Sequence, residues 1–141
     1  MDAIDRTLLD LLAEDASQPL KTLAAEVGLS RSSVRDRILR LRAQGVIRRF
    51  TIEIGLADGN VGGMLFIRLA QTPDPITVQA ISTRPEVARC YSLSGPIDLL
   101  VELRGQDVSS VNRVRDEIAR LPGVADVETS LILSRDKASS D

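Results

Sequence analysis

Residues 28–45, GLSRSSVRDRILRLRAQG, join a glycine-containing turn to a basic amphipathic segment. Ser30 is a suitable N-cap for a helix that begins at the next residue, because its hydroxyl can accept from a free backbone N–H. Leu29 and Val34 stand at the two positions of a hydrophobic staple around that cap. The segment therefore predicts a helix that starts directly after Ser30.

The predicted helix has an apolar stripe and a basic surface. Its apolar residues fall within about one-sixth of a turn of the helical wheel: Val34, Ile38 and Leu41. The remaining surface carries hydroxyl side chains near the N-terminus and guanidinium groups further along, which suits a DNA major groove. A merely solvated helix would alternate in charge sign, whereas five of the six charged residues between Arg31 and Arg42 are arginines. The pattern favours DNA binding.

Two further helical patterns precede this segment. The first has apolar residues at helical spacing with Asp2 as its N-cap, and residues 17–19, SQP, interrupt it. The second begins near Leu20 and ends at Gly28. So few residues then separate it from the basic helix that the two must cross steeply. This arrangement is typical of a helix-turn-helix.

After the basic helix the hydrophobic period changes. Residues 46–54, VIRRFTIEI, read as a strand that would form a wing and bring Arg48 and Arg49 to the flanking DNA backbone. The following stretch, GLADGNVGG, contains four glycines and suits a hinge. We therefore expect a winged helix-turn-helix DNA-binding domain over residues 1–50 and a strand and glycine-rich hinge over residues 51–62.

The second half alternates between strand and helix patterns. The expected order is a strand over 64–70, a helix capped by Asp74, strands over 87–94 and 97–103 separated only by Gly95 and Pro96, a helix capped by Asp107, and a strand over 124–133. This βαββαβ order predicts a ferredoxin-like domain over residues 63–134, a polar tail over 135–141 and an α+β fold overall. The two helices would cover one face of the sheet. Because the strands are apolar on both faces, the bare face is expected to meet another sheet in a homodimer.

Composition argues against an enzyme and a membrane protein. The 141-residue chain has a net charge of −2, yet residues 30–50 hold seven arginines against Asp36, which indicates a polyanionic partner. It has no histidine, the commonest general base and metal ligand. No apolar run has the length of a membrane span, and Met1 leads into acids rather than into a signal peptide. The single cysteine, Cys90, reads as a buried structural thiol in a reducing cytoplasm. We expect a cytoplasmic protein without cofactor or metal.

Both halves resemble the Lrp/AsnC (leucine-responsive and asparagine regulator) family of transcription factors, through the stretches IDRTLLDLLAEDASQPLKTLAAEVGLSRSSVRDRILRLRAQGVIRRFT, SLSGPIDLLVEL and RLPGVADVETSLIL. The resemblance implies an N-terminal domain that binds double-stranded DNA and a ferredoxin-like domain that dimerises. It also implies higher assemblies, often four dimers in a ring. An amino acid or a similar small effector is expected where the dimers meet.

Two sets of candidate site residues follow. The predicted DNA-binding residues are Ser30, Arg31, Ser32, Ser33, Arg35, Asp36, Arg40, Arg48 and Arg49. The predicted effector-binding residues, which align with the family's cleft, are Gly95, Pro96, Asp98, Val108, Thr129 and Ser130. The family commonly has Gly-Asp-x-Asp in the hairpin, and this chain has proline in place of the first aspartate. Asp98 would accept from an ammonium group, with a structural role in its own turn as the alternative.

The leading hypothesis is therefore a sequence-specific transcription regulator whose assembly or DNA affinity responds to a small effector, with an amino acid as the expected ligand. A second hypothesis is a nucleoid-organising protein that binds DNA without a ligand. Its only support is the missing first aspartate of the hairpin. An enzyme on a ferredoxin-like scaffold is disfavoured, because the carboxylates are scattered and no histidine accompanies them.

Overall fold

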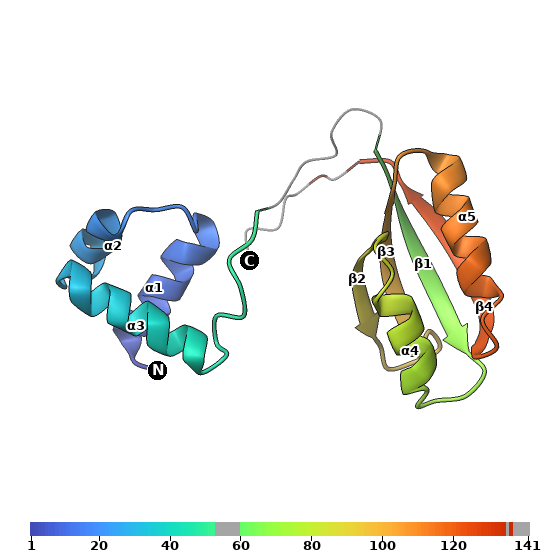
Figure 1. The fold of residues 1–141 in the computed structure, drawn as a ribbon, viewed down its shortest axis with the longest axis horizontal. Coiled ribbons are helices and arrows are strands. Elements are labelled where there is room, and N and C mark those ends of the chain that lie inside the picture. Colours follow the sequence, from blue (N-terminus) through green and yellow to red (C-terminus); the bar gives the residue numbers. More distant parts are fainter. Residues whose placement is uncertain (53–59, 135, 137–141) are drawn as a thin grey trace. The chain divides into compact units, whose positions relative to one another are not determined.

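The structure is a computed structural model that describes residues 1–52, 60–134 and 136. The described residues form two compact units, which we call the helical unit (residues 1–52) and the sheet unit (residues 60–134) (Figure 1). The predicted hinge over 51–62 lies mostly outside the described residues, and its last two residues belong to a strand. The predicted tail over 135–141 also lies outside them, apart from residue 136.

The helical unit contains the predicted helix-turn-helix. Its three helices are α1 (Ala3–Glu14), α2 (Leu20–Val27) and α3 (Arg31–Ala43). Asp2 caps α1 in a capping box with Asp5, and Ser30 caps α3 by accepting from the backbone N–H of Ser33. Gly28 ends α2 at a φ of +66°, a left-handed conformation that glycine adopts without strain. Aliphatic side chains of all three helices make one core, with Leu8, Leu12, Leu23, Ala24 and Val34 at its centre.

The predicted wing strand over 46–54 is wrong for the part that the structure describes, residues 46–52, where the chain makes no strand. The backbone N–H groups of Val46 and Ile47 instead donate to the Leu41 carbonyl, at 3.0 and 3.2 Å, and close the end of α3. A strand needs a neighbour to share its hydrogen bonds, and no strand of the described residues pairs with this segment. Residues 53 and 54 lie outside the described residues.

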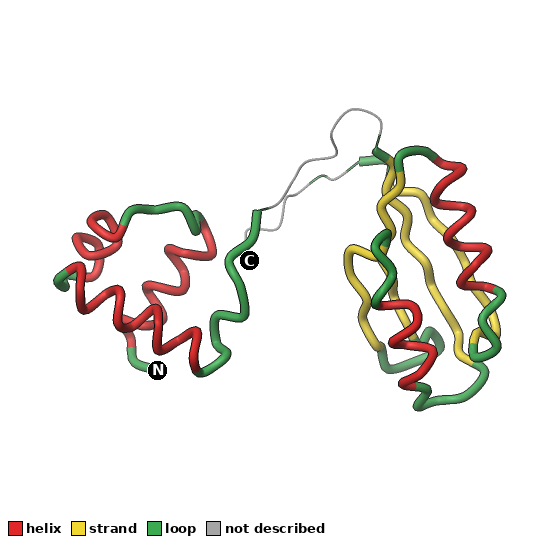
Figure 2. Tube along the Cα trace, in the orientation of Figure 1, coloured by secondary structure: helices red, strands yellow, loops and turns green. Residues whose placement is uncertain are grey.

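The sheet unit has the predicted βαββαβ order. Its elements are β1 (Val61–Leu69), α4 (Pro75–Ser82), β2 (Val87–Ser92), β3 (Leu99–Gly105), α5 (Val108–Ala119) and β4 (Val124–Ile132). The four strands, yellow in Figure 2, pair antiparallel in the order β2-β3-β1-β4. Asp74 and Asp107 cap α4 and α5 by accepting from the backbone N–H groups of Thr77 and Ser110, as the sequence predicts.

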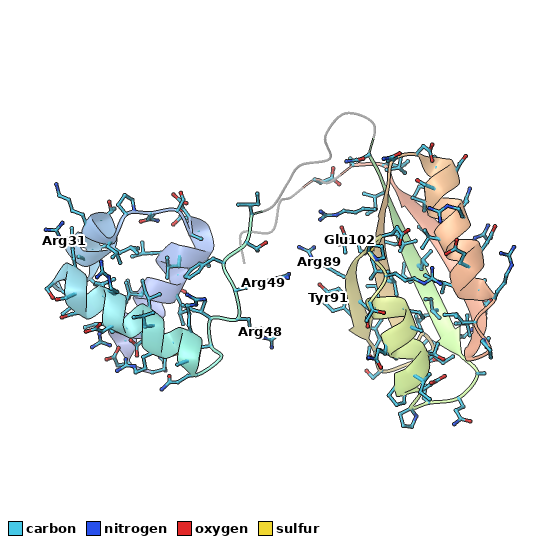
Figure 3. All side chains as sticks on the ribbon, in the orientation of Figure 1. Arg31, Arg48, Arg49, Arg89, Tyr91 and Glu102 are labelled. Carbon is cyan, nitrogen blue, oxygen red and sulfur yellow. The ribbon has the colours of Figure 1, made fainter. Side chains whose placement is uncertain are left out.

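The two faces of the sheet differ in what covers them. Helices α4 and α5 pack on one face over an aliphatic core, to which β1 and β3 contribute Leu65, Ile67, Leu99, Val101 and Leu103. The strand register places alternate residues on the other face, which we call the open face: Met64, Phe66, Arg68, Arg89, Tyr91, Leu100, Glu102, Arg104, Asp126, Glu128, Ser130 and Ile132. No element of the sheet unit covers the open face. It carries apolar side chains around a buried Glu102, which lies 3.3 Å from a guanidinium nitrogen of Arg89 (Figure 3).

Cys90 is half-buried and packs against the core of the sheet unit, and burial raises the pKa of its thiol. Within the described ranges, no helix is long and apolar enough to cross a membrane. The same residues contain no group of three metal-ligating side chains placed to hold an ion.

Candidate DNA-binding surface and effector site

Three serine hydroxyls gather at the N-terminus of α3. The Ser30 Oγ accepts from the backbone N–H of Ser33 at 3.1 Å and lies 3.0 Å from the Ser32 Oγ and 2.8 Å from the Ser33 Oγ. The structure thus gives Ser30 a capping role, in addition to its predicted place at the DNA surface. Ser32 is exposed beside it, at the N-terminal end of α3.

The arginines of α3 fall into two groups. Arg31 and Arg35 are exposed and make no ion pair with any carboxylate of the described residues. Arg42 is also exposed, and its guanidinium carbon lies 5.7 Å from the centroid of the Phe50 ring. Arg37 and Arg40 turn toward α1 and bind its acidic first turn. The first group is the part of α3 whose positive charge stays unpaired within the described residues.

Asp5 is the residue that holds the second group, and sequence reasoning missed it. Its side chain is 1% exposed, and its Oδ1 lies 2.7 Å from Nη1 of Arg37. The Nη2 of Arg40 lies 3.1 Å from both carboxylate oxygens of Asp5. The backbone N–H of Asp2 and these guanidinium groups lower the pKa of Asp5 to about 2. The sequence did contain a signal for this buried acid: Asp5 is at helical spacing from Leu8 and Leu12, and so lies on the apolar stripe of α1.

Three other predicted DNA-binding residues are also exposed in the helical unit. Asp36 is exposed on α3, and Arg48 and Arg49 are exposed in the segment that follows it. Figure 3 shows Arg31 near one end of the helical unit and Arg48 and Arg49 beyond the other end of α3. A helix of this length spans about 20 Å, so the basic side chains cover the distance of several base pairs. Exposed arginines therefore lie along α3 and in the segment that follows it.

The sheet unit contains a cleft of about 770 Å³ where the β2–β3 hairpin meets the start of α4. Its lining residues are Leu69, Thr72, Pro73, Asp74, Pro75, Val78, Ser92, Leu93, Ser94, Gly95, Asp98 and Leu99. Two residues of the predicted effector set, Gly95 and Asp98, therefore lie in one cleft, and Pro96 is not among its lining residues. The lining is mostly apolar with two carboxylates and no basic side chain.

Asp98 holds the hairpin to the neighbouring strand. Its Oδ2 accepts from the backbone N–H of Leu69 at 2.8 Å, and its own backbone N–H donates to the Ile67 carbonyl at 2.9 Å. Its carbonyl accepts from the Leu93 backbone N–H, also at 2.9 Å, and Gly95 turns the loop at a φ of +111°. The prediction that only two residues separate the strands is wrong, because these bonds close a longer loop between Ser92 and Leu99.

The rest of the predicted effector set lies elsewhere in the sheet unit. Val108 begins α5 beyond the end of β3 that is opposite to Asp98. Thr129 pairs with Leu65 on the helix-covered face, and Ser130 pairs with Met64 on the open face. One chain therefore does not gather the predicted set into a single site.

A basic helix-turn-helix unit and a βαββαβ unit with its own cleft define a DNA-binding protein with a second binding domain. Residues 1–42 match the AsnC-type helix-turn-helix domain, and residues 64–141 match the Lrp/AsnC ligand binding domain. The HTH-type transcriptional regulator LysM of Saccharolobus solfataricus is 34% identical over 133 residues, which cover 94% of each chain. The chain belongs to the Lrp/AsnC family of transcriptional regulators.

Other relatives agree in length and fold. The HTH-type transcriptional regulator FL11 of Pyrococcus horikoshii is 27% identical over 143 residues, which cover 100% of this chain and 95% of FL11. An AsnC family transcriptional regulator from Agrobacterium tumefaciens has a crystal structure with a TM-score of 0.85 and 26% identity, over 100% of this chain and 95% of its own. The chain is thus a DNA-binding transcriptional regulator with a ligand-binding domain, and not an enzyme.

Proposed function

We propose that this chain regulates transcription by binding specific DNA sequences through α3, and that a small effector, an amino acid, changes its assembly or its DNA affinity. The observation that supports the proposal is that two different features lie on two different units of the chain. A basic surface lies on the helical unit, and a cleft of about 770 Å³ lies on the sheet unit. A regulator needs two such sites if a ligand at one is to change binding at the other.

The proposed DNA contacts follow from exposure and charge. Ser32 and Ser33 lie at the start of α3, where they would reach base edges, together with Asp36 further along the helix. Arg31 and Arg35 have guanidinium groups that no carboxylate of the described residues neutralises, and they would bind phosphates or guanine. The exposed arginines after α3, Arg48 and Arg49, would add backbone contacts outside the recognition helix.

The proposed effector lies in the cleft beside Asp98. One oxygen of this carboxylate binds the Leu69 backbone N–H, which leaves the other to accept from an ammonium group. Leu69, Val78 and Leu99 would contact an apolar side chain of the ligand. A transcriptional regulator from Neisseria meningitidis with the same fold, at a TM-score of 0.83 and 23% identity over 99% of this chain and 94% of its own, has been crystallised as a complex with L-Met.

The proposed assembly brings copies of the sheet unit together. The open face carries Met64, Phe66 and Leu100, and no element of the sheet unit covers them, so a second sheet would bury them in a homodimer. Further dimers would build the higher oligomer, up to an octamer. Val108, Thr129 and Ser130 lie away from the cleft of their own chain, so they would contribute to an effector site only from another copy.

A thermal-shift screen of the full chain against the common amino acids tests the effector. A ligand present at 100 times its Kd stabilises the protein that binds it by about 2.7 kcal/mol, which is a readable change in melting temperature. We expect at least one amino acid to raise the melting temperature of the sheet unit and to change the DNA affinity. If none does, and the chain binds unrelated duplexes equally well, the ligand-independent nucleoid-organising role replaces this proposal.

A further inference from the structure

The contact between Arg40 and Asp5 leaves part of the guanidinium group free. Both hydrogen bonds from Arg40 to the Asp5 carboxylate come from one nitrogen, Nη2. The side chain of Arg40 is 51% exposed, whereas that of Asp5 is 1% exposed. Because a guanidinium group carries five N–H donors in a rigid plane, holding one nitrogen fixes the direction of the others.

Arg37 differs from Arg40 in this respect. Its Nη1 binds Asp2 and Asp5 together, at 2.7 Å from an oxygen of each, and its side chain is only 22% exposed. Both neighbouring acids raise the pKa of Arg37, which fits a charge that is neutralised inside the helical unit. Arg37 therefore fastens α3 to α1, and Arg40 is the member of the network with donors left to reach outward.

We propose that Asp5 is a positioning residue for DNA binding, which holds the guanidinium group of Arg40 so that its remaining N–H groups meet a DNA phosphate. The inference rests on the proposed function, in which α3 lies on DNA. A long arginine side chain loses rotamer entropy when it is fixed, and a buried carboxylate that fixes it beforehand removes that loss from the binding step. Asp5 itself touches no DNA in this account.

The alternative is that Asp5 only neutralises Arg40. Removal of the carboxylate would then free a positive charge and increase the affinity for DNA and its dependence on salt. Positioning predicts the opposite sign, because an unheld side chain pays the full cost of ordering when it binds. The two accounts are therefore separated by the direction of one effect.

A double-mutant cycle on the full chain tests the proposal. The variants are Asp5→Asn, Arg40→Gln and their combination, with Arg35→Gln as the matched control because Arg35 makes no contact with Asp5. The probe is a duplex carrying the sequence that the unmodified chain selects from a random library. Dissociation constants are measured over a series of salt concentrations, at a temperature where circular dichroism shows each variant fully folded.

We expect Arg40→Gln to weaken binding roughly tenfold and to reduce the salt slope by about 0.9 for each protomer bound. Asp5→Asn should weaken binding roughly threefold in the unmodified chain and should have no effect in the Arg40→Gln background. Asp5→Asn and Arg35→Gln should act independently, so that the dissociation constant of the double variant rises by the product of the two single changes. Tighter binding by Asp5→Asn, or the same loss in both backgrounds, would overturn the proposal.

Two further outcomes separate this inference from the proposed function. If Arg35→Gln weakens binding and Arg40→Gln does not, the proposal that α3 binds DNA is supported and the positioning role of Asp5 is refuted. If neither variant changes the affinity for DNA, both proposals are refuted. Arg40→Lys covers the case in which Asp5→Asn does not fold, because lysine keeps the charge and loses the planar fork. Positioning predicts weaker binding for Arg40→Lys, and unchanged affinity and salt slope would refute it.

Discussion

The carboxylate of Asp98 binds the backbone N–H of Leu69 at 2.8 Å, so a residue of the β2–β3 hairpin is tied to the end of β1. This bond crosses between segments that are 29 residues apart in the sequence. It also lies in the cleft proposed for the effector. Asp98 therefore has a structural role whether or not a ligand is bound, and the position must be tested for both functions separately.

Replacement of Asp98 should destabilise the sheet unit even without a ligand. Asp98→Ala leaves the half-buried Leu69 N–H without its acceptor, and we expect the free energy of unfolding of the sheet unit to fall by about 1–3 kcal/mol. Asp98→Asn keeps an acceptor oxygen in place, so its loss should be smaller. Calorimetry of the ligand-free chain measures both changes.

The control for this prediction is Asp126→Ala. Asp126 makes an ion pair with Arg68 at 2.7 Å, but both side chains are about half exposed, so its removal should change stability by no more than about 1 kcal/mol. Equal melting temperatures for Asp98→Ala and Asp126→Ala would remove the structural role. An Asp98→Asn variant that folds normally and no longer responds to any amino acid would locate the effector at this carboxylate.

The open face of the sheet should decide the oligomeric state. Phe66 lies on this face between Leu100 and Glu128 in the strand register. Phe66→Glu would place a charge inside the proposed sheet-to-sheet interface, and we expect the full chain to become monomeric at micromolar concentration in sedimentation velocity. Ile76→Glu is the matched control, because Ile76 is an exposed apolar residue on α4 and lies away from the open face.

Two results would contradict this prediction. The first is a Phe66→Glu variant with the sedimentation coefficient of the unmodified chain. The second is an Ile76→Glu variant that dissociates to the same extent, because the interface would then lie on the helix-covered side. Amide hydrogen exchange at Val101, in the core of the sheet unit, confirms that each variant remains folded.

The stability of the helical unit should depend on acid pH through Asp5. Its pKa is about 2 in the folded chain, against an ordinary value of 3.8. A carboxyl group with a lowered folded pKa stabilises the fold fully above its unfolded pKa and loses that contribution as the pH falls toward the folded value. We therefore expect the helical unit to lose stability between about pH 4 and pH 2.

Amide hydrogen exchange at Leu8 measures this dependence, because Leu8 is fully buried in the core of the helical unit. The Asp5→Asn variant should be less stable at pH 6 and should show a flatter pH profile below pH 4. Asp36→Asn is the control, since Asp36 is exposed on α3 and makes no ion pair with any basic side chain of the described residues. An Asp5→Asn profile as steep as that of the unmodified chain would show that other acids cause the loss.

The sequence predicted the features that depend on near neighbours. Asp2, Ser30, Asp74 and Asp107 each cap the helix they were expected to cap, because an N-cap involves residues only three positions apart. The βαββαβ order followed for a similar reason, since turn residues and apolar periods mark each element locally. The helix-turn-helix and the βαββαβ order could therefore both be predicted from the sequence.

Contacts between distant segments were not predicted. Asp5 and Arg40 are 35 residues apart, and only the packing of α1 on α3 makes them partners. The strand expected over 46–54 had the right period, but no strand of the described residues lies beside it. The effector set came from a resemblance to a known family, and the structure places its members at different ends and on different faces of the sheet unit.

The most direct test of the central proposal, that the exposed arginines of α3 bind DNA, is the salt dependence of DNA affinity for the full chain and its Arg35→Gln variant. Each phosphate contact contributes about 0.9 to the slope of log affinity against log salt. Arg115→Gln, on α5 of the sheet unit, is the control of equal charge change. The proposal predicts that Arg35→Gln lowers the slope by about 0.9 for each protomer bound while Arg115→Gln leaves it unchanged. Equal slopes for the unmodified chain and Arg35→Gln would contradict it.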